Sequence, residues 1–154
     1  MIISAISIRK LYMYIAPKFH FAESSIMTVD LFTETKDQDA AFWDNASEKY
    51  AASKIGDMDA YKRTLQRTRD YLSTKDDVVE LGCGTGTTAL QLAAHAGSYL
   101  ATDISPGMIR IAKEKLSAAD LQGLEFEVAT SQSILVPNSG FDRVLGFNYL
   151  HLVP

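Results

Sequence analysis

The chain has 154 residues, of which 47% are hydrophobic and 22% charged, and its formal net charge is −4. This length suits one domain or part of one, and the composition is ordinary for a globular protein. The negative charge and the lack of a basic cluster argue against a nucleic-acid partner, and no apolar run is long enough to span a bilayer.

The first 30 residues differ from the rest of the chain. Residues 1–15 are apolar and β-branched, and no acidic residue occurs before Glu23. A secretory signal would place its charge before the apolar stretch and a small-residue cleavage site after it, and neither is clear here. We expect residues 1–30 to be an extension outside the fold, with a basic organelle-targeting peptide as the alternative.

Helical and extended patterns follow one another along the remaining chain. Apolar residues spaced three or four apart predict two helices within 35–71, separated at Gly56, with Asp59 as a candidate cap of the second. Beyond them, the pattern predicts strands at 77–81, 99–102, 124–129 and 141–146 and helices at 87–96 and 106–119. Alternating strands and helices indicate an α/β fold with a doubly wound parallel sheet and right-handed connections.

The loop after the first of these strands has glycine at every second position, at Gly82, Gly84 and Gly86. Glycine lacks a Cβ and tolerates positive φ, so backbone at such a loop can come very close to a ligand. Asp103 ends the next predicted strand, where an acidic residue is placed to hydrogen-bond a pair of ribose hydroxyls. These features predict a ligand of the adenosine type.

The details of the loop narrow the choice of ligand. A dinucleotide fingerprint has its third glycine one residue further on, and a phosphate-binding P-loop needs a lysine that this loop lacks. Glu80, just before the glycines, would repel a pyrophosphate and suits a ligand with an ammonium group.

Three segments resemble class I S-adenosylmethionine-dependent methyltransferases. Residues 78–86 with Asp103 resemble the family's motif I and its following acidic position, 101–109 its second strand and next helix, and 141–152 its fourth strand and the loop after it. The resemblance implies a Rossmann-like sheet of seven strands, of which this chain carries the N-terminal half in the order 3-2-1-4. We therefore expect residues 31–154 to be a partial, truncated methyltransferase domain. Its fourth strand would be an exposed edge open to self-association.

The resemblance also implies a set of residues around S-adenosylmethionine. Glu80 would receive the ammonium group, the glycines would approach the methionine and ribose parts, and Asp103 would bind the ribose. The full expected set is Tyr50, Glu80, Gly82, Cys83, Gly84, Gly86, Asp103, Ile104, Met108, Thr130, Ser131 and Asn148.

Several of these residues have plainer alternatives. Tyr50, expected to cover the cofactor, is equally well explained as a packed aromatic, and Asp103 as a helix cap. Ile104 and Met108, expected beside the adenine, fit core positions as well. Thr130 stands where the family usually has an acidic residue, so adenine recognition departs from the family pattern there.

No catalytic residue is assigned beyond a weak base candidate, His151. No Cys/His cluster has metal-ligand spacing, and the single cysteine, Cys83, fits a reducing, cytoplasmic setting. The expected reaction is methyl transfer to a small-molecule acceptor. The alternatives are an NAD-dependent oxidoreductase fragment and a non-catalytic binding or interaction module.

Overall fold

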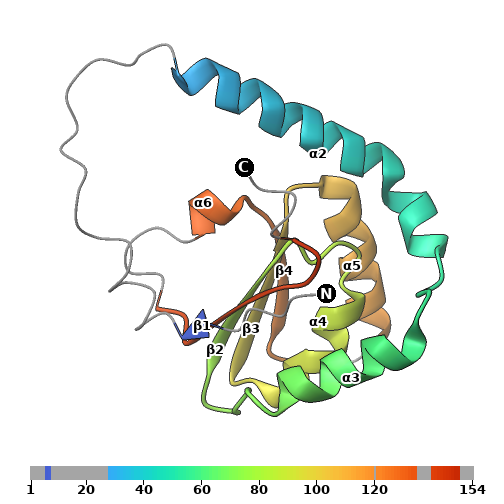
Figure 1. Cartoon of the computed structure of the whole chain (residues 1–154), viewed down its shortest axis with the longest axis vertical. Coiled ribbons are helices and arrows are strands. Elements are labelled where there is room, and N and C mark those ends of the chain that lie inside the picture. Colours follow the sequence, from blue (N-terminus) through green and yellow to red (C-terminus); the bar gives the residue numbers. More distant parts are fainter. Residues whose placement is uncertain (1–5, 8–27, 120, 135–139, 150–154) are drawn as a thin grey trace.

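A five-stranded sheet in the order β1-β5-β2-β3-β4 lies at the centre of the computed structural model, which describes residues 6–7, 28–119, 121–134 and 140–149 (Figure 1). Its four long strands are parallel, and the short β1 runs antiparallel to β5. The parallel strands confirm the predicted 3-2-1-4 order. The strands are Ile6–Ser7 (β1), Asp77–Leu81 (β2), Ser98–Asp103 (β3), Leu124–Val128 (β4) and Arg143–Gly146 (β5).

The helices lie mainly on one side of this sheet. In Figure 1, α4 and α5 run beside the strands, α2 passes beside the start of α5, and α6 lies on the opposite side. Their bounds are Thr28–Ala52 (α2), Met58–Arg69 (α3), Thr87–Leu92 (α4, continued by a 3₁₀ turn), Pro106–Ala119 (α5) and Ser131–Ile134 (α6). No described helix combines the length and the apolar character needed to cross a membrane.

The boundary between α2 and α3 follows the predicted break at Gly56, but the cap is a different residue. The side chain of Asp57, not Asp59, accepts a hydrogen bond from the Ala60 N–H at 2.8 Å. A cap residue must lie outside the first helical turn to reach an N–H three residues on. Asp59 already lies within that turn.

The core forms between the sheet and helices α4 and α5. Val78 of β2 is fully buried in this core, and Val79, which points to the other face of the strand, is fully buried as well. Ala89 and Leu92 of α4 and Ala112 of α5 are also completely buried. This packing fixes the carboxyl ends of β2 and β3 relative to the helices that follow them.

The free edge predicted for the fourth parallel strand is partly covered. Ile6 pairs with Val144 and Ser7 with Arg143, so β1 supplies backbone partners to β5. The prediction of an unpaired edge is wrong at these positions, because a distant segment satisfies the strand's N–H and C=O groups. Ile6 and Ser7 belong to the stretch expected outside the fold, and α2 begins within it; the domain division at residue 30 stays a prediction.

We predict that Gly86→Ala destabilises the protein by about 2–4 kcal/mol. Gly86 has φ +73°, and a Cβ there would lie 2.6 Å from the Phe126 ring and 2.9 Å from the Ala112 Cβ. Gly56→Ala is the matched control, because a Cβ at Gly56 meets nothing within 4 Å. Urea unfolding should show the control within about 0.5 kcal/mol of wild type. Equal stabilities for both variants would contradict the packing described here.

Candidate functional site

The candidate site lies where the parallel strands end. Leu81 of β2 is paired with Thr102 of β3 and with Gly146 of β5, so these three strands end at one edge of the sheet. The glycine loop follows Leu81 directly, and Asp103 is the last residue of β3. In open α/β sheets ligands bind in the crevice at this edge.

The glycine loop has the backbone conformation that the sequence predicted. Gly82, Gly84 and Gly86 have φ values of +66°, +54° and +73°, in the left-handed region that favours glycine. The Cys83 N–H donates to the Thr102 carbonyl at 2.9 Å, and the Gly86 N–H donates to the Cys83 carbonyl at 3.0 Å. The loop is thus a defined turn attached to β3.

Asp103 joins this loop to the start of α5. Its Oδ2 accepts from the Gly84 N–H at 2.9 Å, and its Oδ1 accepts from the Ser105 N–H at 3.0 Å. Burial raises the pKa of Asp103, opposed by its hydrogen bonds from the backbone. The cap of α5 is Ser105, whose Oγ accepts from the Met108 N–H at 3.1 Å. Helix capping therefore does not explain Asp103.

Glu80 lies beneath the loop and is only 1% exposed. The Tyr99 hydroxyl donates to its Oε2 at 2.6 Å. Burial raises the pKa of Glu80 to about 7, the Tyr99 hydrogen bond opposes this rise, and the nearby Asp103 adds to it. A buried carboxyl in this state is stabilised as an anion by any cation that reaches it.

Helix α2 is attached to the N-terminus of α5 by polar contacts. The Asp44 carboxylate accepts from the Gly107 N–H and, at 3.2 Å, from the Ser105 hydroxyl. One turn further along, Glu48 forms an ion pair with Arg110 of α5. These contacts hold the second half of α2 beside the site.

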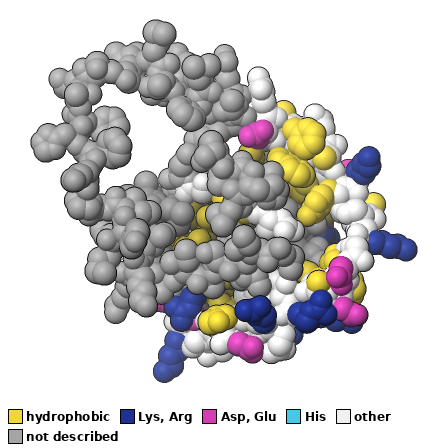
Figure 2. All heavy atoms as spheres, viewed as in Figure 1, with side chains coloured by type: hydrophobic (Ala, Val, Ile, Leu, Met, Phe, Trp, Pro, Cys, Tyr) yellow, Lys and Arg dark blue, Asp and Glu magenta, His cyan; other side chains and the backbone are white. Residues whose placement is uncertain are grey.

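As a result, Tyr50 of α2 lies against the glycine loop. A Cβ on Gly84 would lie 3.5 Å from the Tyr50 ring, and among the described residues nothing else comes within 4 Å. Tyr50 is 50% exposed and meets Trp43 edge to face, with ring centroids 6.2 Å apart. Figure 2 shows hydrophobic side chains gathered along the described part of α2. The sequence placed Tyr50 in this region, and the structure brings it there.

Tyr149 was missed by the sequence reasoning. Its ring lies directly over Gly82, where an added Cβ would clash with Tyr149 Cδ2, and a Cβ added at Gly146 would lie 3.5 Å from the Tyr149 Cβ. Asn148, which is exposed, turns the chain at this point with φ +54°. No local sequence pattern gives this ring orientation, because it depends on a non-glycine residue in the left-handed region.

The residues expected beside the adenine agree with the prediction only in part. Ile104 is half-buried, whereas Met108 is 2% exposed, which favours the core alternative for Met108. The Thr130 hydroxyl oxygen accepts from the Ser133 N–H at 3.1 Å and so caps the unpredicted helix α6, which begins at the half-buried Ser131. The hydroxyl expected to meet adenine is therefore also part of this cap.

The remaining candidates add no reactive group. Burial strongly raises the pKa of the Cys83 thiol, so the sulfur stays protonated and unreactive. His151 lies outside the described residues. No cluster of three or more metal-ligating side chains occurs among the described ones.

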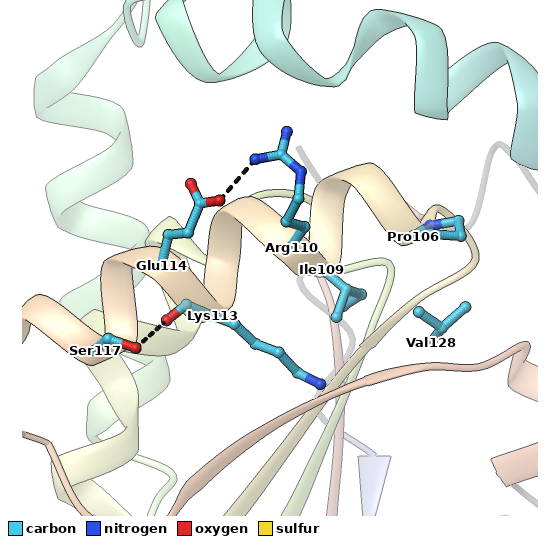
Figure 3. A pocket seen from close by; sticks show the side chains of 7 residues that line it. All are labelled: Pro106, Ile109, Arg110, Lys113, Glu114, Ser117 and Val128. Carbon is cyan, nitrogen blue, oxygen red and sulfur yellow. Dashed lines mark hydrogen bonds and ion pairs between the residues drawn. The ribbon is translucent and has the colours of Figure 1, made fainter.

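A groove of about 450 Å³ lies elsewhere, between α5 and the edge strand β4 (Figure 3). Lys113 extends across it, and Arg110 turns away to pair with Glu114 at 2.7 Å. None of the predicted site residues lines this groove. It is therefore separate from the glycine loop.

Comparison with known proteins relates the chain to one family. The sequence profile of a methyltransferase domain family matches residues 78–154. An uncharacterized methyltransferase of Mycobacterium tuberculosis is 32% identical over 74 residues, which cover 48% of this chain and 36% of that protein. The magnesium-protoporphyrin O-methyltransferase of Rhodobacter capsulatus is 49% identical over 52 residues, or 34% of this chain and 23% of that protein.

The fold is similar to that of solved structures. A DhpI–SAH complex has 26% sequence identity and a TM-score of 0.50, and the match covers 61% of this chain and 44% of that one. The chain thus spans less than half the length of these relatives.

We predict that Glu80 makes the stability of the free protein depend on pH. Its pKa is raised from 4.5 to about 7, so the folded state holds the proton more tightly than the unfolded state. The free energy of unfolding therefore falls as the pH rises from about 4.5 through about 7, by on the order of 1–3 kcal/mol at pH 8. Glu80→Gln should remove the loss, so urea unfolding should give similar stabilities at pH 5 and a more stable variant at pH 8.

The control is Glu125→Gln at an exposed position of β4. It should follow the wild-type pH profile. A difference between wild type and Glu80→Gln that stays constant from pH 5 to pH 8 would contradict the prediction.

Proposed function

Because the chain belongs to the methyltransferase domain family, we propose that it is part of an S-adenosylmethionine-dependent methyltransferase acting on a small-molecule acceptor. The sequence profile of the family matches 77 of the 154 residues. The proposal includes a cytoplasmic location. The chain supplies the cofactor-binding half of the site, and other parts of the acceptor pocket belong to the remaining length seen in its relatives.

The observation that carries the proposal is the position of the Asp103 carboxylate. It lies at the end of β3, beside the left-handed glycine turn, with one oxygen on the Gly84 N–H and the other on the Ser105 N–H. A carboxylate oxygen accepts more than one hydrogen bond, so each oxygen keeps capacity for a ribose hydroxyl. The open space at Gly84, bounded by Tyr50, fits the backbone's close approach to a nucleoside.

Glu80 supports the proposal at the amino-acid end of the same ligand. Its burial disfavours the anion, and the nearby Asp103 adds to this effect. An ammonium group above the loop would offset both, directly or through water. A pyrophosphate at this place would add charge of the same sign, so the site fits an aminoacyl nucleoside better than a dinucleotide.

The proposed chemistry asks little of the protein itself. S-adenosylmethionine supplies an electrophilic methyl group when bound. The chain's own residues bind and orient: Asp103 holds the ribose, the glycine backbone admits the ligand, and Tyr50 covers it. Orientation alone accounts for a large part of the rate in such transfers.

The acceptor class is supported by two observations. The Rhodobacter capsulatus relative is named for a small acceptor, magnesium-protoporphyrin. In Figure 2, Asp and Glu side chains lie beside the Lys and Arg side chains on the visible described surface. The formal net charge of −4 gives the chain no general attraction to a nucleic acid, so a small molecule is the better proposal.

We predict that Asp103→Ala weakens binding of S-adenosylhomocysteine by about 1–3 kcal/mol, because it removes the acceptor for the ribose hydroxyls. Isothermal titration calorimetry measures the effect, and circular dichroism confirms that the variant is folded. Asp59→Ala, an exposed change on α3, is the control and should bind like wild type.

Two outcomes would contradict the proposed function. Unchanged affinity in Asp103→Ala would remove this carboxylate from the site. Tight binding of NAD, with no binding of S-adenosylhomocysteine by the wild-type chain, would favour an oxidoreductase instead.

We predict a second effect at Tyr149, whose ring fills the space over Gly82 that the methionine part would approach. Tyr149→Ala should raise the association rate of S-adenosylhomocysteine several-fold, because no ring has to move first. Tyr149→Phe keeps the ring and should match wild type. Stopped-flow fluorescence of Trp43, the single tryptophan, provides the signal. A slower association in Tyr149→Ala would contradict this prediction, because it would mean that the ring contacts the ligand and helps to bind it.

A further inference from the structure

Lys115 makes three polar contacts with the segment on both sides of Gly86. It lies on α5, and its Nζ donates to the Thr85 carbonyl at 3.0 Å, to the Thr85 hydroxyl at 2.9 Å and to the Thr87 hydroxyl at 3.1 Å. These are three acceptors for the three protons of one ammonium group. The bonds join positions 28 to 30 residues apart in the sequence.

The helix dipole does not explain this placement. Lys115 brings a positive charge to the first turn of α4, which is the end of a helix where cations are disfavoured. Burial lowers the pKa of Lys115, which adds to this cost. The carbonyl and the two hydroxyls are the groups that compensate it.

Lys115 supplies the side-chain hydrogen bonds to Thr85 and Thr87, while the Tyr61 hydroxyl contacts the next residue, Thr88, at 3.4 Å. Gly86 is the N-cap of α4 and offers no side chain to cap it. Asp103 fixes the loop earlier, at the Gly84 N–H. Two side chains thus bind the loop backbone: Asp103 at the Gly84 N–H and Lys115 at the Thr85 carbonyl.

We propose that Lys115 is a positioning residue that sets the backbone of the glycine loop for the amino-acid end of the ligand. The ligand part of this inference rests on the proposed function; the anchoring of the loop does not. The Lys115 ammonium group binds Thr85 and Thr87, and it acts on the ligand through the orientation of the Thr85–Gly86 peptide.

The test compares Lys115→Met with Lys113→Met. Both variants remove one ammonium group from α5, but Lys113 is exposed and extends across the separate groove shown in Figure 3. Amide hydrogen exchange of the free protein, measured by NMR, should be at least tenfold faster at Gly86 in Lys115→Met and unchanged in Lys113→Met. The buried Ala101 of β3 is the internal reference for global stability and should not change.

Binding supplies the second measurement. In Lys115→Met the affinity for S-adenosylhomocysteine should fall about tenfold and that for adenosine less than threefold, because the Asp103 anchor at the ribose remains. Affinities that fall in equal proportion, or Gly86 exchange that is equal in both variants, would overturn the proposal. If wild type binds neither ligand, the proposed function fails, and hydrogen exchange alone still decides the role of Lys115.

Discussion

The arrangement of the site depends on one carboxylate that binds two backbone segments at once. Asp103 accepts hydrogen bonds from the Gly84 N–H, in the loop after β2, and from the Ser105 N–H at the start of α5. Asp103 ends a buried strand, so the sheet fixes its position. Its two hydrogen bonds in turn fix the loop and the start of α5. Charge-assisted hydrogen bonds of this kind are stronger than neutral ones, which makes Asp103 suited to the task.

A second layer of contacts builds on this core. Ser105, placed by Asp103, caps α5 and donates to Asp44, which attaches α2 to the same helix terminus. That attachment brings Tyr50 to Gly84. The site is thus assembled from segments distant in the sequence, each held by the polar groups of the one beneath it.

The sequence predicted the parts of the fold that local chemistry determines. The bounds of β2 and α5 agree with the predicted 77–81 and 106–119, because glycines and Pro106 mark them clearly. β1 escaped prediction because a two-residue strand has no periodicity, and its pairing with β5 is long-range. Tyr149 and Lys115 escaped for a related reason: their roles arise from contacts with a loop tens of residues away, which no local pattern encodes.

The most direct test of the account is an experimental structure of the chain with S-adenosylhomocysteine bound. The account predicts both ribose hydroxyls within about 2.7–3.2 Å of the Asp103 carboxylate oxygens, with the hydrogen bond from Gly84 retained and the amino group above the glycine loop toward Glu80. A nucleoside bound elsewhere on the sheet edge, or an Asp103 side chain turned to solvent in the complex, would contradict it.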